Sequence, residues 1–85
     1  MTDAAVSLLS SFAAVLSSTR HRRGCSLSEL AEQCGIALSQ LQAMEAGRRA
    51  PTLSQLLALG EALQCEAADL VEAAVQGARA STRGK

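Results

Sequence analysis

The chain has 85 residues and a formal net charge of zero, and 48% of its residues are hydrophobic although only Phe12 is aromatic. This length suits one small domain, and no apolar run reaches the about 18–20 residues of a membrane span. The apolar beginning of the chain lacks a basic segment, so we expect no signal peptide there. We therefore expect a cytoplasmic protein that does not cross a membrane.

Charge is unevenly distributed along the chain. Residues 20–23 and 48–49 are basic, whereas residues 61–72 contain acidic side chains and no basic ones. A protein of zero net charge can still bind nucleic acid, because a local basic patch matters more than the total charge. The composition is therefore compatible with a nucleic-acid partner.

Alanine and leucine supply most of the apolar residues, and no segment alternates apolar and polar residues as a half-buried strand would. Both residue types favour helices, so the sequence predicts an all-α domain. Two helix starts are clear, because Ser26 with Glu29 and Thr52 with Gln55 each fit a capping box. The expected helices, in one domain over residues 1–80 with a basic tail at 81–85, span residues 3–22, 26–34, 38–46, 52–63 and 66–80.

The second and third predicted helices are short and follow one another across a tight turn at Gly35. This pattern is typical of a helix-turn-helix, in which the second of the two helices enters the major groove of DNA. Arg48 and Arg49 follow that helix, and Pro51 prevents the helix from continuing.

Several segments, taken in order and at their spacing, resemble the Xre/Cro-type helix-turn-helix regulators. That family includes lambdoid phage repressors and small controller proteins of restriction–modification systems. The resemblance covers about residues 12–70 and implies a compact five-helix domain with a lambda repressor-like fold. The segments that carry it are Phe12, Leu16, Arg20 and Gly24, then SLSELAEQCGI at residues 26–36, LQAMEAGRRAPT at 41–52 and LLALGEAL at 56–63.

The resemblance also implies which residues contact DNA. The base-reading positions are Leu38, Ser39, Gln40, Gln42 and Ala43. The phosphate-contacting positions are Ser26, Leu27, Ser28, Arg48 and Arg49, with Arg22 and Arg23 as further candidates. Arg22 and Arg23 also have an alternative interpretation, as a solvated helix end whose positive charge suits the helix dipole. Glutamine can pair with adenine, and apolar side chains can contact the thymine methyl group, so this set predicts A·T-rich half-sites.

Three of these positions, and one neighbouring position, depart from the family pattern. Leu27 stands where the family often has a glutamine that holds a phosphate, and Ala37 stands where it often has a Ser or Thr cap. Leu38 and Ala43 cannot form hydrogen bonds with base edges. These residues favour an alternative function, in which the same scaffold meets a protein partner as an antitoxin, antirepressor or adaptor and reads DNA weakly or not at all.

The resemblance further pairs Arg20 of the first helix with Glu45 near the end of the third as a structural ion pair. Arg20 is then structural first and a phosphate contact second, and Glu45 is not a catalytic acid. No catalytic constellation is present in the sequence, so we expect a protein that is not an enzyme and needs no cofactor.

The three cysteines fall at core positions of the family. An odd number of cysteines without a CxxC pair argues against a disulfide framework. Their spacing with His21 fits no zinc pattern, so we expect no metal site. The simplest interpretation is that Cys25, Cys34 and Cys65 act as small hydrophobic residues.

The last predicted helix carries an apolar stripe that includes Val71, Ala74, Val75 and Ala78. This stripe can pack within the chain, but a domain of this size does not bury all of its alanine and leucine residues. We therefore expect these four residues to meet the same surface of a second chain in a two-fold dimer. A homodimer separates its two reading helices by about 34 Å, one turn of DNA, which predicts a palindromic site. The sequence thus predicts a sequence-specific, double-stranded DNA-binding transcription regulator.

Overall fold

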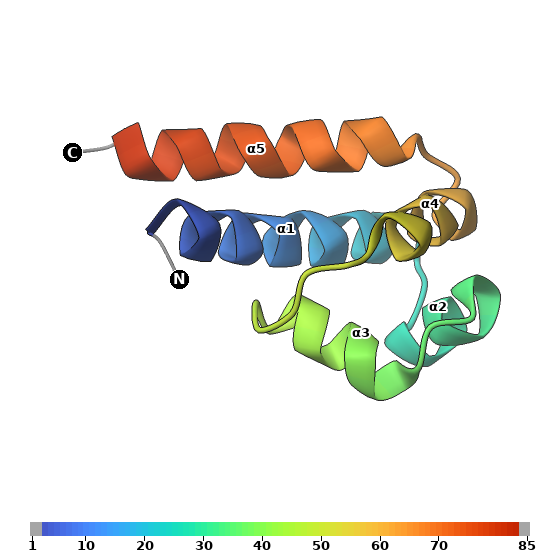
Figure 1. Ribbon diagram of the computed structural model, residues 1–85. Coiled ribbons are helices and arrows are strands. Elements are labelled where there is room, and N and C mark those ends of the chain that lie inside the picture. The colour runs from blue at the N-terminus through green and yellow to red at the C-terminus, as the bar shows by residue number, and fades with distance from the viewer. Residues whose placement is uncertain (1–2, 84–85) are drawn as a thin grey trace.

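The computed structural model describes residues 3–83, and these residues form five helices without strands (Figure 1). The helices are α1 (Asp3–Arg22), α2 (Leu27–Cys34), α3 (Leu38–Glu45), α4 (Leu53–Ala62) and α5 (Ala67–Arg83). The predicted all-α class is therefore confirmed. None of these helices combines the length and the apolar character that crossing a membrane requires.

The largest difference from the predicted helix bounds is at the end of α5. This helix continues to Arg83, so residues 81–83, which we assigned to a basic tail, are helical. The prediction was wrong there because alanine and the long basic side chains that flank the serine and threonine extend a helix readily. Residues 84–85 of the predicted tail lie outside the described residues.

Helix α1 lies at the centre of the arrangement. In Figure 1, α5 runs antiparallel along one side of α1, and α3 lies on its other side. Helix α2 contacts both α3 and α4, and α4 also contacts α5. This arrangement leaves α3 at the edge of the molecule that is farthest from α5.

The core is built mainly from leucine side chains contributed by all five helices. Each of the three cysteines is free and partly buried, and each packs against this core from its edge. The buried core residues are Phe12, Leu16, Leu30, Ile36, Leu41, Met44, Leu59, Leu63, Leu70 and Ala74.

Both predicted capping boxes are present. In α2 the Ser26 hydroxyl accepts from the Glu29 N–H at 3.1 Å, and the Glu29 carboxylate accepts from the Ser26 N–H at 2.8 Å. Gly35 ends α2 with a φ of 73°, a left-handed conformation that glycine adopts without strain. These two signals hold α2 to eight residues and so determine where α3 begins.

Helices α1 and α5 approach each other closely at one point. The Ser11 hydroxyl of α1 donates a hydrogen bond of 2.7 Å to the backbone carbonyl oxygen of Ala74 in α5. Gly77, one turn further along α5, leaves room for this hydroxyl, because a Cβ atom at Gly77 would lie 2.3 Å from Ser11 Oγ. The contact joins the two longest helices directly.

Candidate nucleic-acid interface

Helix α3 has one buried face and one open face. Leu41 and Met44 are fully buried and anchor the helix against α1 and α2. On the open face Ser39 and Gln42 are exposed, and Leu38 is 39% exposed. Three of the five predicted base-reading side chains therefore lie on the outer surface of α3.

The other two predicted base-reading residues, Gln40 and Ala43, are partly buried. The amide of Gln40 accepts a hydrogen bond of 3.1 Å from the amide nitrogen of Gln55 in α4. The sequence predicted only a capping role for Gln55. Its second contact could not be found from local spacing, because the two glutamines lie in different helices.

The start of α3 lacks a side-chain cap. Ala37 occupies the N-cap position, and its methyl group cannot accept a hydrogen bond. Its carbonyl oxygen accepts instead from the backbone N–H groups of Gln40 and Leu41, at 3.0 and 3.1 Å. The structure thus confirms that no side chain caps the N-terminus of α3, where the candidate reading surface begins.

The start of α2 offers one exposed hydroxyl and its backbone N–H groups to a phosphate. The Ser26 hydroxyl is engaged in the capping box, whereas Ser28 is exposed. The Leu27 side chain is partly buried and packs against the core, so only its backbone N–H could meet DNA. Backbone N–H groups at a helix N-terminus can hold an anion without help from the side chain.

Arg48 and Arg49 lie in the turn that follows α3, and both are exposed. The turn is held by backbone bonds, including one of 2.9 Å from the Arg48 N–H to the carbonyl oxygen of Ala43. Within residues 3–83 neither arginine side chain bonds to another protein group. These two charges are therefore available to phosphates next to α3.

Arg22 and Arg23 are also exposed, but both have partners inside the chain. Arg22 donates to the Thr19 hydroxyl at 3.3 Å. Arg23 donates to the side-chain oxygen of Gln64, in the turn between α4 and α5. These bonds favour the alternative that we considered for the pair, namely a solvated helix end.

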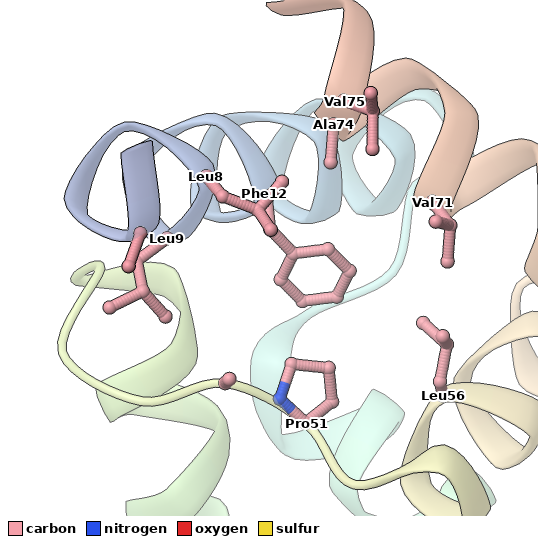
Figure 2. Close-up of a pocket in the computed structure, with 10 residues that line it drawn as sticks. Leu8, Leu9, Phe12, Pro51, Leu56, Val71, Ala74 and Val75 are labelled. Atoms are coloured by element: carbon pink, nitrogen blue, oxygen red, sulfur yellow. The ribbon is translucent and has the colours of Figure 1, made fainter. Parts of the chain in front are cut away.

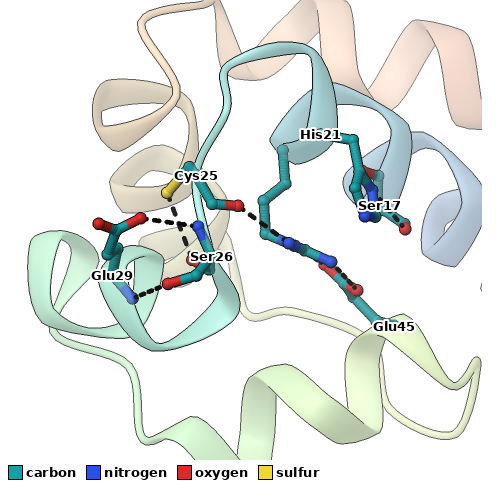
Figure 3. Close-up of polar contacts among 7 residues, drawn as sticks. Ser17, His21, Cys25, Ser26, Glu29 and Glu45 are labelled. Carbon is teal, nitrogen blue, oxygen red and sulfur yellow. Dashed lines mark hydrogen bonds and ion pairs between the residues drawn. The ribbon is translucent and has the colours of Figure 1, made fainter.

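Arg20 connects α1 to both elements of the helix-turn-helix through Cys25 and Glu45, which are labelled in Figure 3. Its Nε atom donates to Glu45 at 2.7 Å and its Nη2 atom at 3.1 Å, and Nη1 donates to the carbonyl oxygen of Cys25 at 2.9 Å. The Arg20 and Glu45 side chains are 12% and 13% exposed. The hydrogen bond to the Glu45 carboxylate raises the pKa of Arg20, so the guanidinium stays charged.

Comparison with known proteins agrees with this geometry. A family model described as helix-turn-helix matches residues 17–70, more than half of the chain. The chain belongs to the Xre-type helix-turn-helix family. It is therefore a DNA-binding transcription regulator of the helix-turn-helix class. A search among curated proteins gave no match.

Two solved structures resemble this helix-turn-helix protein over most of its length. Both are crystal structures of the clp gene regulator ClgR from Corynebacterium glutamicum. The first is 27% identical with a TM-score of 0.82, and the match covers 91% of this chain and 82% of that chain. The second is 30% identical with a TM-score of 0.76, and the match covers 82% of this chain and 90% of that chain.

This helix-turn-helix protein also has an apolar groove that the sequence did not suggest (Figure 2). The groove lies between α1, α5, the start of α4 and the connection from α3 to α4, and its volume is about 390 Å³. Leu8 and Val71 are half exposed at this groove. The lining residues are Ala5, Leu8, Leu9, Phe12, Ala50, Pro51, Leu56, Val71, Ala74 and Val75.

The predicted dimer surface on α5 needs one correction. Ala74 is 2% exposed in the single chain, because it faces α1 beside Ser11. It has almost no surface left to bury against a second chain. Val71 is exposed, and Val75 and Ala78 are partly buried.

Proposed function

We propose that the chain binds a specific palindromic site in double-stranded DNA as a homodimer, with α3 of each copy in the major groove. It acts in the cytoplasm, without enzymatic activity or a cofactor. The observation that carries this proposal is an open α3 face followed directly by two arginines whose side chains have no partner among the described residues 3–83. The likeness to ClgR, a clp gene regulator, supports a regulatory role.

Base reading is assigned to the outer face of α3. Ser39 and Gln42 are exposed and carry hydrogen-bonding groups, and Leu38 presents an apolar surface that suits a thymine methyl group. The buried Leu41 and Met44 fix the opposite side of the helix. The outer side chains are thereby held on a rigid element, which direct readout requires.

Phosphate binding is assigned chiefly to Arg48 and Arg49. Phosphate contacts fix the position of a protein on the duplex and carry no sequence information of their own. Each contact that neutralises a phosphate contributes about 0.9 to the slope of the logarithm of affinity against the logarithm of salt concentration. Replacing both arginines by alanine is therefore expected to lower this slope by about 2 and to weaken specific and non-specific binding together.

Dimerisation is assigned to the side of α5 that borders the apolar groove. Val71 at 40% and Leu8 at 41% leave apolar surface open in the single chain, and Val75 lines the same groove. A two-fold contact brings the same patch of both copies together. Val71→Glu is expected to produce a monomer in sedimentation at micromolar concentration, whereas Val6→Glu, which changes an exposed valine that does not line the groove, is expected to leave the dimer intact.

The deciding experiment is selection of duplex DNA from a random pool. The wild-type protein is expected to enrich a palindrome whose half-site centres lie about one helical turn apart. Arg48→Glu with Arg49→Glu is expected to abolish the enrichment. Arg22→Glu with Arg23→Glu carries the same change of charge at side chains that have partners inside the chain, and it is expected to retain the site at reduced affinity.

The selection also distinguishes the alternative function. If the wild type enriches no sequence and its binding disappears at moderate salt, α3 does not read DNA, and the proposal is wrong. The apolar side chains of Ala37 and Leu38 would then become candidates for a protein contact, because both are exposed.

A further inference from the structure

A chain of hydrogen bonds leads from the start of α4 to Gln40 of α3. The backbone N–H of Thr52 donates to Gln55 Oε1 at 3.0 Å. Gln55 Nε2 then donates to Gln40 Oε1 at 3.1 Å. Gln55 belongs to the capping box of α4, so its side chain is held in place by the helix start itself.

The direction of this chain follows from its first member. A backbone N–H can only donate, whereas an amide side chain has a donor end and an acceptor end. The oxygen of Gln55 must therefore face Thr52, which turns its nitrogen to Gln40. The Gln40 side chain must therefore accept this bond through its oxygen. The NH₂ group of Gln40 has no protein acceptor in the part of the chain that the structure describes.

We infer that Gln55 is a positioning residue that determines how Gln40 reads DNA, an inference that rests on the proposed role of α3. The Gln40 side chain is partly exposed, and one acceptor position of its Oε1 is used by Gln55. Its two N–H donors have no acceptor within residues 3–83. Guanine and thymine present only acceptors in the major groove, two and one respectively, whereas cytosine presents an NH₂ donor and adenine presents an NH₂ donor beside one acceptor. Gln40 is thus expected to prefer guanine or thymine, in place of the adenine that a glutamine side chain alone suggests.

Capping of α4 alone would not need the amide nitrogen of Gln55. The capping box uses Oε1, and glutamate serves equally well at this position of a capping box. The nitrogen, which glutamate lacks, contributes the bond to Gln40. Gln55→Glu therefore keeps the cap and replaces the donor that faces Gln40 by an acceptor.

The reversal has a defined consequence for Gln40. With a carboxylate at position 55, both oxygen atoms accept, so Gln40 must donate its NH₂ group to α4 and turn its oxygen toward DNA. The preferred base at one pair of symmetric positions in the site is expected to change from guanine or thymine to adenine or cytosine. A well-placed amide contact corresponds to a preference of about fivefold or more.

The experiment compares selected sites of the wild type, Gln55→Glu, Ser54→Glu and Gln40→Ala. Ser54→Glu adds the same charge at an exposed neighbouring residue that does not bond to Gln40, so it is expected to lower affinity without changing the preferred base. Gln40→Ala is expected to remove the preference at that position alone. Thermal unfolding of each variant checks that the fold is retained.

The outcomes distinguish a failure of this inference from a failure of the proposed function. If the wild type enriches a palindrome but Gln55→Glu selects the same bases as Ser54→Glu, Gln55 does not position Gln40 for base reading, and this inference is wrong while the proposed function stands. The same holds if Gln40→Ala weakens all sequences equally, since Gln40 then contacts a phosphate. If the wild type enriches no site, the proposed function fails and the inference fails with it.

Discussion

The guanidinium of Arg20 and the carboxylate of Glu45 face each other through two hydrogen bonds, which join the end of α1 to the end of α3. A third bond from Arg20 reaches the carbonyl oxygen of Cys25, just before α2. One side chain thereby fixes both helices of the helix-turn-helix relative to α1. The position of the open α3 face depends on this pair.

Removing one partner of the pair is expected to be costly. Arg20→Ala leaves the Glu45 carboxylate largely buried without its cation, and it also leaves the Cys25 carbonyl without its donor. The free energy of unfolding, measured with urea at pH 7, is expected to fall by about 3 kcal/mol. Replacing Arg20 and Glu45 together by methionine is expected to cost less than Arg20→Ala. A double variant that is less stable than the single one would contradict this account.

A missing cap can be supplied at the start of α3. Ala37→Ser introduces a hydroxyl that can accept from a backbone N–H in the first turn, and such a cap contributes about 1 kcal/mol. Ala37 has a φ of −57° and a ψ of 139°, near the −75° and 163° of the capping residue Ser26, so the substitution needs only a small backbone adjustment. Ala46→Ser makes the same change at the other end of α3 and serves as the control. If both variants shift the thermal midpoint equally, capping is not the cause.

The contact between Ser11 and Gly77 predicts that two substitutions are coupled. Alanine in place of glycine favours a helix by about 1 kcal/mol, but at position 77 the new Cβ atom meets Ser11 Oγ. Gly77→Ala is therefore expected to stabilise the Ser11→Ala variant and to stabilise the wild type much less or not at all. A double-mutant cycle from urea unfolding measures the difference, and equal effects in both backgrounds would show that the two side chains do not compete.

Features decided by neighbouring residues could be predicted from the sequence, and features decided across helices could not. The capping boxes at Ser26 and Thr52 connect residues three positions apart, so spacing was enough to find them. The bond between Gln40 and Gln55 joins two helices, and no local sequence pattern predicts it. Periodicity on α5 showed an apolar stripe, but it could not tell that α1 covers Ala74 while Val71 stays open.

The pair of Arg20 and Glu45 is an intermediate case. The two residues are 25 positions apart, and the residues alone did not connect them. The resemblance to the Xre/Cro-type family implied the pair, because that family pairs an arginine of the first helix with a glutamate near the end of the third. The resemblance did not imply the apolar groove. Local spacing could not predict it either, because its lining comes from four separate parts of the chain.

The thiol of Cys65 predicts a loss of stability at alkaline pH. Burial, and then the nearby Asp69 carboxylate, raise the pKa of Cys65 above the ordinary thiol value of about 8.5. The folded chain therefore holds this proton more tightly than the unfolded chain does. Its contribution to stability is complete below the unfolded pKa and is lost as pH rises through the folded pKa.

Two measurements check this prediction. The sequence contains no tyrosine or tryptophan, so thiolate absorbance in the ultraviolet can be followed without interference from those rings. The urea midpoint, followed by circular dichroism from pH 7 to pH 10, is expected to decrease less in Cys65→Ala than in the wild type. Cys34→Ala, which removes another partly buried thiol, controls for the lost side chain and is expected to keep the decrease. If Cys65→Ala follows the wild-type pH profile, the Cys65 thiol does not account for the alkaline loss.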